Sequence, residues 1–536
     1  MGLKKHLFKI SLLTMLILAG VLCISSLGSY SGKAQSNQNT IVDHGSVPNG
    51  NHPLRNDSSK MDSPNGSVPN GTPSLNAPPN NNFRNEAMNN LGNNQTGNYT
   101  TQVAAYAGIF LIIFLVAYYL ITHKKVNIHP SQETLVILTV LGVGFLLRIT
   151  LATLINGHPY DLSTFKNWAT TAANNLTQFY QGRHSSDYPP LYIYVLYMIG
   201  KLGSLSAVSP YFTLFLKLPS IIADIVTSFL LYKQAKKYLT LEMSLLLSAF
   251  YAFNPAVFIN STIWGQVDSF FTLLIVSAVV LLTERKIGLA SVLFTSAVLM
   301  KPQGIIFLPV VFFELIRQKN LKSWVKILVP GFITAIVLVL PFSWNADWLW
   351  IFKLFASTLG EYPYASVNAF NFFSLLGKNY AKDAGTLFLF SYHTWGMIFI
   401  VLITALSWLL YIRGKSRVFA PAVALVLIVG VFTFSARMHE RYLFPALALS
   451  IITFIYLKDK RLLLVAAGLS STIYINTHYV LYETLNGVNS ISYGPFLIVS
   501  SILNILCFVY LVKVLFDLTR SEGRGWSKVT SETPID

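Results

Sequence analysis

The stretch ETLVILTVLGVGFLLRITLATLINGHPYD, residues 133–161, decides the fold. Residues 133–155 are almost all apolar, and a helix needs only ~20 such residues to cross a bilayer. The stretch ends in a short polar segment whose last residue is an acid, Asp161. Similar apolar runs recur along the chain, so we predict an all-α polytopic membrane protein. The runs are continuous rather than alternating, which excludes a membrane β-barrel.

The composition supports this fold class. Of the 536 residues, 53% are hydrophobic and 11% are charged, whereas soluble domains carry about 25% charged residues. The net charge is +17, but the Lys and Arg residues form short clusters between apolar runs, as cytoplasmic loops do. We therefore exclude nucleic acid as a partner. Cys23 and Cys507 lie inside apolar runs and offer neither a disulfide framework nor a metal site.

The first 132 residues divide into three parts. Residues 1–29 have a basic start and an apolar run, which predicts an uncleaved signal anchor, with a cleaved signal peptide as the alternative. Residues 30–102 are rich in Asn, Gly, Pro and Ser and repeat the hexapeptide GSVPNG, so we expect a disordered exoplasmic tract. Residues 103–132 predict an extra transmembrane helix and a cytoplasmic linker.

Residues 133–516 are expected to form the main transmembrane domain, followed by a cytoplasmic tail, 517–536. When every basic cluster is placed in the cytoplasm, the chain makes about fourteen crossings, about twelve of them in this domain. The runs 287–300 and 303–316 are short for a full crossing. Such short runs favour broken or tilted helices around a cavity.

The same topology places seven polar motifs together on the exoplasmic face. Ionisable residues at membrane depth are costly and are usually functional. Their convergence predicts an active site on the extracellular side of the cell membrane. The motifs are Asp161, Asp187-Tyr188, WGQVD at 264–268 with Gln266 and Asp268, KPQ at 301–303, EYPY at 361–364, NAFN at 368–371, and RMHER at 437–441.

An amphipathic helix is predicted between the two loop acids. Apolar residues between 162 and 179, among them Phe165 and Trp168, recur at spacings of three and four, and polar residues fill the other face. Such a helix lies in the plane of the membrane interface. It would hold Asp161 at the depth of the lipid phosphates.

Each motif also has a purely structural interpretation. Asp161 suits a helix N-cap, and Asp187 suits a turn. Within the apolar runs, Asp224 is expected to pair with Lys217. The remaining structural interpretations are a bridge between Asp268 and Lys301, a solvated loop for His439, and loop-folding roles for Asn368 and Asn371.

Taken in order, the motifs resemble those of a known family. Tyr160-Asp161 with Trp168, DYPPL at 187–191, Asn254-Pro255 with WGQVD, MKPQ at 300–303 and HER at 439–441 resemble GT-C integral-membrane glycosyltransferases. The similarity covers about residues 133–516. It is strongest to the dolichyl-phosphate-glucose-dependent glucosyltransferases of lipid-linked oligosaccharide assembly and their bacterial mannosyltransferase-like relatives. The eukaryotic enzymes carry Lys where this chain has Arg441, which keeps the charge but changes the donor geometry.

The resemblance implies a GT-C-like bundle that transfers a hexose, mannose or glucose, from a polyprenyl-phosphate donor with inversion. It assigns Asp161 as the general base on the acceptor hydroxyl, and Asp187, Tyr188 and Trp168 as support on the acceptor side. Charge that develops on the leaving phosphate calls for fixed cations. The residues expected to bind the donor phosphate or sugar are Lys301, Arg437, His439, Arg441, Gln266 and Asp268.

No cofactor is expected beyond the lipid-linked donor. No cluster of divalent-metal ligands stands out, although the two loop acids offer an alternative metal site. The acceptor is left open among a glycan, a lipid and a protein. The rival functions are a lipid-carrier flippase or transporter, which needs mid-membrane ionisable residues and an inverted repeat, and a scaffold that presents the Asn-rich tract.

Overall fold

In the computed structural model, residues 2–42, 95–181, 186–344 and 346–525 are described, and the side chains of 2–5, 31–42, 95–96 and 521–525 are left out. The described chain is almost entirely helical. Its only strands are the two-residue β1 (Thr386–Leu387) and β2 (Phe390–Ser391), which pair in a small antiparallel hairpin. The predicted all-α class is confirmed.

Within this described part, nine helical segments are long and apolar enough to cross a membrane. The protein is therefore a multi-pass membrane protein, as predicted. Eight of these segments correspond to α1 (Gly2–Val42), α3 (Thr100–Thr122), α4 (Glu133–Leu154), α7 (Phe212–Tyr238), α13 (Leu321–Val339), α16 (Tyr392–Arg413), α17 (Ala420–Phe434) and α20 (Pro495–Gly525). The ninth joins α8 (Leu241–Ala252), α9 (Pro255–Phe258) and the π-helical turn η6 (Ile259–Trp264).

The other predicted crossings also contain helices, but these are shorter or more polar. Three are apolar helices of fewer than 18 residues: α10 (Asp268–Thr283), α11 (Ile287–Val298) and α18 (Pro445–Leu457). The other two are α12 (Leu308–Gln318) and α19 (Arg461–Leu485). Short helices suit a bundle whose interior, rather than lipid, surrounds them.

The core of the bundle lies around α17 and α18. Every residue of α17 from Ala420 to Thr433 is buried, and so is every residue of α18 from Pro445 to Tyr456. A helix that is apolar on all sides belongs inside a bundle. In contrast, α1, α3 and α13 leave many apolar side chains exposed, which is the surface that lipid covers.

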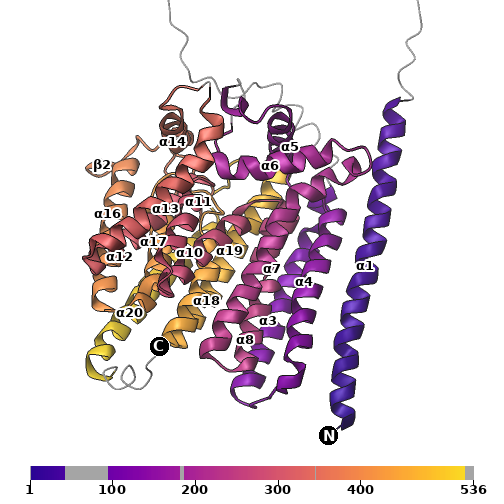
Figure 1. The fold of residues 1–536 in the computed structure, drawn as a ribbon, viewed down its shortest axis with the longest axis horizontal. Helices are drawn as coiled ribbons and strands as arrows, with labels where there is room; N and C mark the ends of the chain where they lie inside the picture. Colours follow the sequence, from indigo (N-terminus) through magenta and orange to yellow (C-terminus); the bar gives the residue numbers. More distant parts are fainter. Residues whose placement is uncertain (1, 43–94, 182–185, 345, 526–536) are drawn as a thin grey trace, which may run out of the picture.

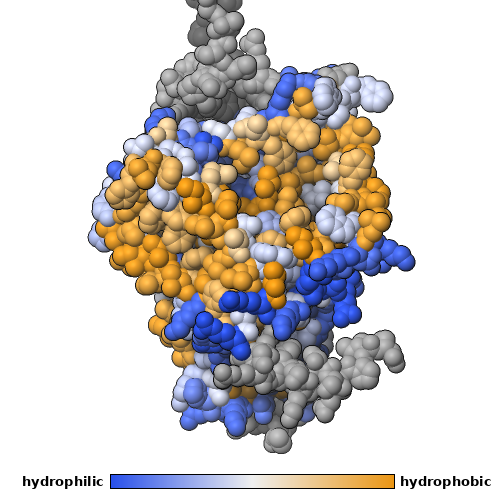
Figure 2. Space-filling view, turned by 90° about the vertical axis from the view of Figure 1, so that its left-hand side faces the viewer, coloured by the Kyte–Doolittle hydropathy of each residue, from blue (hydrophilic) through white to orange (hydrophobic). Residues whose placement is uncertain are grey.

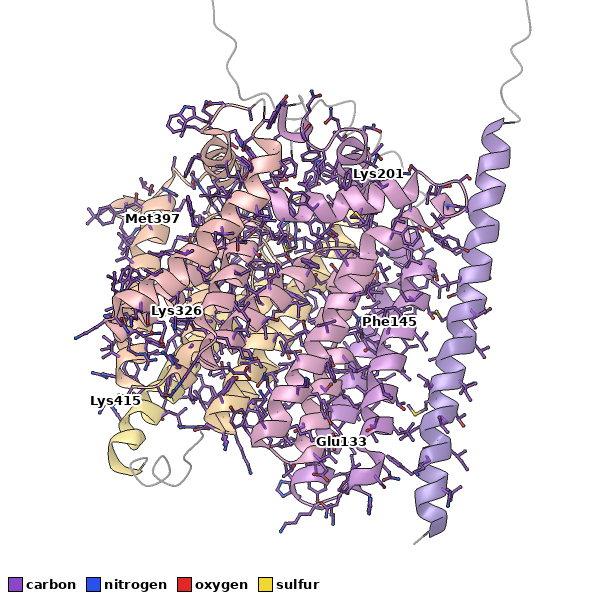
Figure 3. The ribbon with its side chains drawn as sticks, viewed as in Figure 1. Glu133, Phe145, Lys201, Lys326, Met397 and Lys415 are labelled. Atoms are coloured by element: carbon purple, nitrogen blue, oxygen red, sulfur yellow. The ribbon has the colours of Figure 1, made fainter. Side chains whose placement is uncertain are left out.

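The bundle has two distinct ends (Figure 1). Three helices lie above the upper ends of the spanning helices: α5 (Pro159–Asn174), α6 (Pro190–Gly203) and α14 (Trp350–Gly360). Figure 3 places Lys201, near the end of α6, toward this end, and Glu133 and Lys415 toward the other. We call the end with α5 the site face and the opposite end the basic face. Figure 2 shows the apolar belt between them.

The N-terminal segment differs from its predicted boundaries. Helix α1 continues to Val42, and residues 95–99 form a short helix, η2 (Gln95–Tyr99), that leads into α3. The tract predicted to be disordered over 30–102 is therefore helical at both edges. Its central part, residues 43–94, lies outside the described residues. Whether α1 is cleaved stays a prediction about processing.

An ion pair inside the bundle corrects one predicted contact. Asp224 in α7 pairs with Arg148 in α4 at 3.1 Å, and both side chains are fully buried. Lys217 instead donates hydrogen bonds to the carbonyls of Ile155 (2.6 Å) and Thr262 (2.9 Å). The prediction that Asp224 pairs with Lys217 was wrong because helical spacing on α7 alone did not reveal the facing arginine on α4.

Candidate active site

Two glycine turns build the frame of the site. At the end of the π-helical turn η6, Gly265 has φ +91°, and Gly157 before α5 has φ +97°. The His158 amide donates to the Trp264 carbonyl at 3.0 Å, and Leu162 packs where either glycine would carry a Cβ. Left-handed backbone favours glycine, so these positions fix how the two motif loops dock. π-Helical turns are often found at functional sites.

Asp161 lies in the first turn of α5, where two hydrogen-bond donors and the ring of His158 converge on one of its oxygens. Oδ2 accepts hydrogen bonds from Trp264 Nε1 (2.6 Å) and Gln266 Nε2 (2.8 Å), and it lies 3.2 Å from His158 Nδ1. None of these three contacts uses Oδ1. The carboxylate is therefore held in one orientation with its second oxygen left for another group.

The N-cap interpretation of Asp161 was wrong, because His158 holds the N-cap position of α5. Burial raises the pKa of the Asp161 carboxyl, but attraction to His158 and Arg441 and the hydrogen bond from Trp264 outweigh it. The pKa is held well below its ordinary value. Asp161 is therefore ionised at neutral pH, which is the form that accepts a proton.

Asp268 and Lys301 form a buried ion pair beside Asp161. The Lys301 ammonium donates to Asp268 Oδ1, and Asn260 Nδ2 donates to Oδ2 at 3.0 Å. Arg441 Nε lies 3.9 Å from the same Oδ2, and the Arg441 guanidinium lies over the Trp264 ring at 5.6 Å. The predicted contact between Asp268 and Lys301 is confirmed.

The RMHER loop between α17 and α18 adds the acid Glu440 and the neutral His439 to the site. Arg441 Nη1 donates to Glu440 Oε1 at 2.5 Å. Burial and the charges of Arg441 and Lys301 lower the pKa of His439 to about 3. We had expected His439 to be a fixed cation, but at neutral pH it is an uncharged donor or acceptor. The His439 ring packs edge-on against the Tyr362 ring, with 4.6 Å between ring centroids.

The DYPP segment adds an aromatic wall. Tyr188 packs against Trp168 of α5, with 5.4 Å between ring centroids, and the Lys301 ammonium lies 5.3 Å from the centre of the Tyr188 ring. The Tyr188 carbonyl accepts a hydrogen bond from Tyr180 at 2.6 Å. Tyr188 and Trp168 therefore shape the site from the side predicted to face the acceptor.

Asp187 and Glu361 line a small pocket beside this wall. The pocket has a volume of about 220 Å³ and also includes Ser186 and Thr358. Burial raises the pKa of the Asp187 carboxyl, and burial and the Asp187 charge raise the pKa of Glu361 to about 7. A protonated carboxyl donates a hydrogen bond and an ionised one accepts, so this pocket can bond to hydroxyl groups in both ways.

The shifted pKa of Glu361 predicts a pH effect on stability. A carboxyl with a raised folded-state pKa contributes stability below its ordinary pKa, and that stability is lost as the pH rises through about 7. We expect the thermal midpoint of Glu361→Gln to gain on that of the wild type between about pH 4.5 and pH 7. Melting curves across this range test it. Glu483→Gln removes a carboxyl that does not line the pocket and should show no such gain.

Two of the predicted motifs hold the loops together. Arg437 donates to Asp383 Oδ2 (2.7 Å) and to the Leu359 carbonyl (2.8 Å). The structure therefore places Arg437 in a loop bridge, and its role in binding the donor phosphate stays a prediction. Asn368 and Asn371 bond to backbone and loop groups, which confirms their predicted loop-folding role.

Sequence reasoning missed three contributors. His158 was quoted in the motif but given no role, although its spacing from Asp161, i to i+3, was a signal. Asn260 lies in the π-helical turn η6 and donates to Asp268, and helical spacing rules do not predict such a turn. The pairing of Glu361 with Asp187 joins segments more than 170 positions apart, so it was visible only after folding.

In the part of the chain that the structure describes, no three His, Cys, Asp or Glu side chains are grouped so that they could hold a metal ion. The expectation of a metal-free reaction stays a prediction. No protein-family model matches the chain, and no curated protein matches it. We therefore infer function from the residues of the site.

Proposed function

We propose that the protein is an inverting membrane glycosyltransferase of the GT-C type, which transfers a hexose from a polyprenyl phosphate to an acceptor hydroxyl on the exoplasmic face. The observation that carries this proposal is the oriented, ionised Asp161 carboxylate near the buried Lys301 and the partly buried Arg441. A proton acceptor and fixed positive charge are the two groups that this reaction needs.

We assign the roles from the chemistry of the side chains. Asp161 Oδ1 takes the proton of the acceptor hydroxyl while the hydroxyl oxygen forms a bond to the anomeric carbon of the hexose. The bond from that carbon to the phosphate oxygen breaks, and its electron pair stays on the polyprenyl phosphate. Lys301 and Arg441 stabilise the phosphate charge, and neutral His439 donates a hydrogen bond. Asp187, with Glu361, binds hydroxyl groups of the acceptor.

The membrane setting supports the same proposal. Helices α5 and α6 lie at the site face (Figure 1), and helices that lie in a membrane interface are at the depth of the lipid phosphates. A transporter would also bind a lipid-linked sugar, but it needs its charged residues on a path through the bundle. In the bundle interior, Arg148 pairs with Asp224, and Asp224 also accepts a hydrogen bond from Ser261. These contacts suit a structural ion pair better than a transport path.

Purified protein in vesicles with a labelled polyprenyl-phosphate hexose and a panel of hydroxyl acceptors distinguishes the two functions. We expect the label to leave the lipid and join an acceptor, with free polyprenyl phosphate as the second product. Label that stays on its lipid and changes leaflet would instead establish a flippase and refute the proposal.

A further inference from the structure

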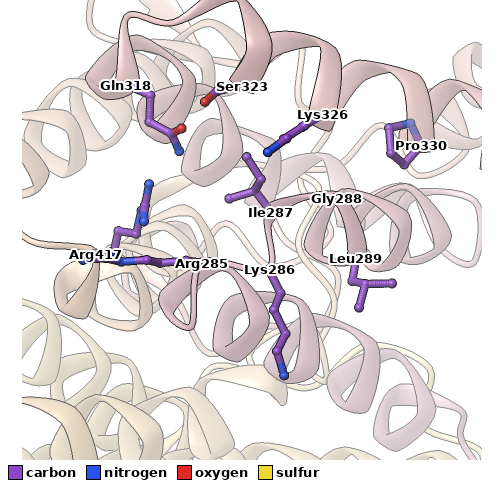
Figure 4. A pocket seen from close by; sticks show the side chains of 10 residues that line it. All are labelled: Arg285, Lys286, Ile287, Gly288, Leu289, Gln318, Ser323, Lys326, Pro330 and Arg417. Atoms are coloured by element: carbon purple, nitrogen blue, oxygen red, sulfur yellow. The ribbon is translucent and has the colours of Figure 1, made fainter. Parts of the chain in front are cut away.

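A second polar cavity lies far from Asp161, between α11 and α13. It has a volume of about 610 Å³, and four cationic side chains line it, together with polar and apolar residues. Figure 4 shows Lys326 extending from α13 toward the space beside Arg285 and Arg417, whereas Lys286 points away from it. Gln318 and Ser323 also border that space. We call this cavity the basic pocket.

The charge of the basic pocket is only partly balanced. Arg417 pairs with Glu314, which also pairs with Arg317, and Lys286 lies 3.6 Å from Glu284, which also pairs with Lys237. Within the described residues, neither Arg285 nor Lys326 has an acidic side chain within 4.0 Å. The pocket therefore has an excess of positive charge that an anion would balance.

The helices that form the pocket approach each other closely. A Cβ at Gly288 of α11 would lie 3.2 Å from the Lys326 carbonyl, and one at Gly331 of α13 would lie 2.7 Å from Ser291 Oγ. Ser291 also donates to the Ile327 carbonyl at 2.6 Å. Small residues allow helices to pack this closely in membranes. Lys326 is thus carried by a closely packed helix, and Arg285 lies in the turn just before α11.

The position of the pocket points to a lipid rather than to a soluble ion. Above Lys326, α13 exposes apolar side chains such as Leu328, Phe332 (67% exposed) and Ile333 to the surrounding membrane. Figure 2, which faces this flank, shows hydrophilic residues directly below the apolar belt. A bound phosphate would lie at the depth of the headgroups, and acyl chains would lie along α13.

We propose that the basic pocket binds the headgroup of an anionic phospholipid, with its phosphate between Arg285 and Lys326 and its acyl chains against α13. Basic pockets between transmembrane helices suit such headgroups. Arginine bonds phosphate oxygens with two donors, and lysine acts as a point charge. This site is separate from the proposed transfer of a hexose and does not depend on it.

The test uses the full-length protein and native mass spectrometry with phosphatidylglycerol as the probe. The pocket variant replaces Arg285 and Lys326 with Gln. The control replaces Lys124 and Lys415 with Gln, which removes the same charge from exposed positions outside the pocket. We expect phosphatidylglycerol to bind the pocket variant at least ten-fold more weakly than the wild type and the control, and phosphatidylcholine to bind all three proteins equally weakly.

Equal loss of phosphatidylglycerol in the control would show general surface attraction and overturn the proposal. Inorganic phosphate that competes with the lipid at a similar concentration would show a soluble-anion site and overturn it as well. If the pocket variant does not fold, the single changes Arg285→Gln and Lys326→Gln are measured instead. Each should weaken lipid binding, and unchanged binding in both would contradict the site.

Discussion

Replacing Asp161 with Asn should reduce hexose transfer by a factor of about 10²–10⁴, the usual contribution of a general base. The amide oxygen can still accept hydrogen bonds from Trp264 and Gln266, so the orientation of the side chain is kept. What is lost is the negative charge that accepts the proton of the hydroxyl. The initial rate of transfer from a labelled polyprenyl-phosphate hexose measures this loss.

The stability of this variant needs a control, because the depressed pKa of Asp161 means that its charge also stabilises the fold at neutral pH. The variant should therefore melt at a lower temperature and be assayed well below its midpoint. Asp347→Asn is the matched change, since Asp347 is 42% exposed, pairs with Lys353 and accepts a hydrogen bond from the Leu349 amide. That control should retain full transfer. Full transfer by Asp161→Asn would remove Asp161 from the mechanism.

Breaking the buried pair of Arg148 and Asp224 should cost about 3–5 kcal/mol of folding free energy. Asp224→Leu leaves the Arg148 guanidinium without its counter-charge, and that side chain is fully buried. Asp224 also accepts from Ser261 of η6 at 2.6 Å, so the turn that carries Trp264 should loosen as well. Unfolding curves of the purified protein measure the loss.

The double variant Arg148→Met with Asp224→Leu distinguishes the effect of an unpaired charge from the effect of altered packing. Replacing a buried ion pair with apolar groups of similar volume is often neutral or stabilising. The double variant should therefore recover most of the stability that Asp224→Leu loses. A single variant as stable as the wild type, or a double variant no better than the single one, would contradict the account of this pair.

The local features of the fold were predictable because they depend on patterns within one segment. The apolar run at 133–155 predicted α4, and the spacing of Phe165 and Trp168 predicted α5. That helix ends at Asn174, so Leu176 and Phe179 lie beyond it. Helix ends depend on caps and on tertiary packing, which periodicity does not report.

For segments that are distant in the sequence, we could predict only which side of the membrane they share, not which contacts they make. The basic clusters indicated which motifs share a face, and the structure brings Asp161, Gln266, Asp268, Lys301 and Arg441 together there. The basic clusters did not indicate which partner each of these side chains contacts. Arg437 was grouped with the donor site, and its ion pair with Asp383 was not predicted. Asp224 was paired with a lysine on its own helix, whereas its partner lies on another.

The most direct measurement is a single-turnover count of products with the purified protein in vesicles. The proposed chemistry predicts one polyprenyl phosphate released for each glycosidic bond formed, with inverted configuration at the anomeric carbon. With Asp161→Asn, both products should form slower by a factor of about 10²–10⁴. Transfer with retained configuration, or an unchanged single-turnover rate with Asp161→Asn, would contradict the assignment of this site as an inverting glycosyltransferase with Asp161 as its base.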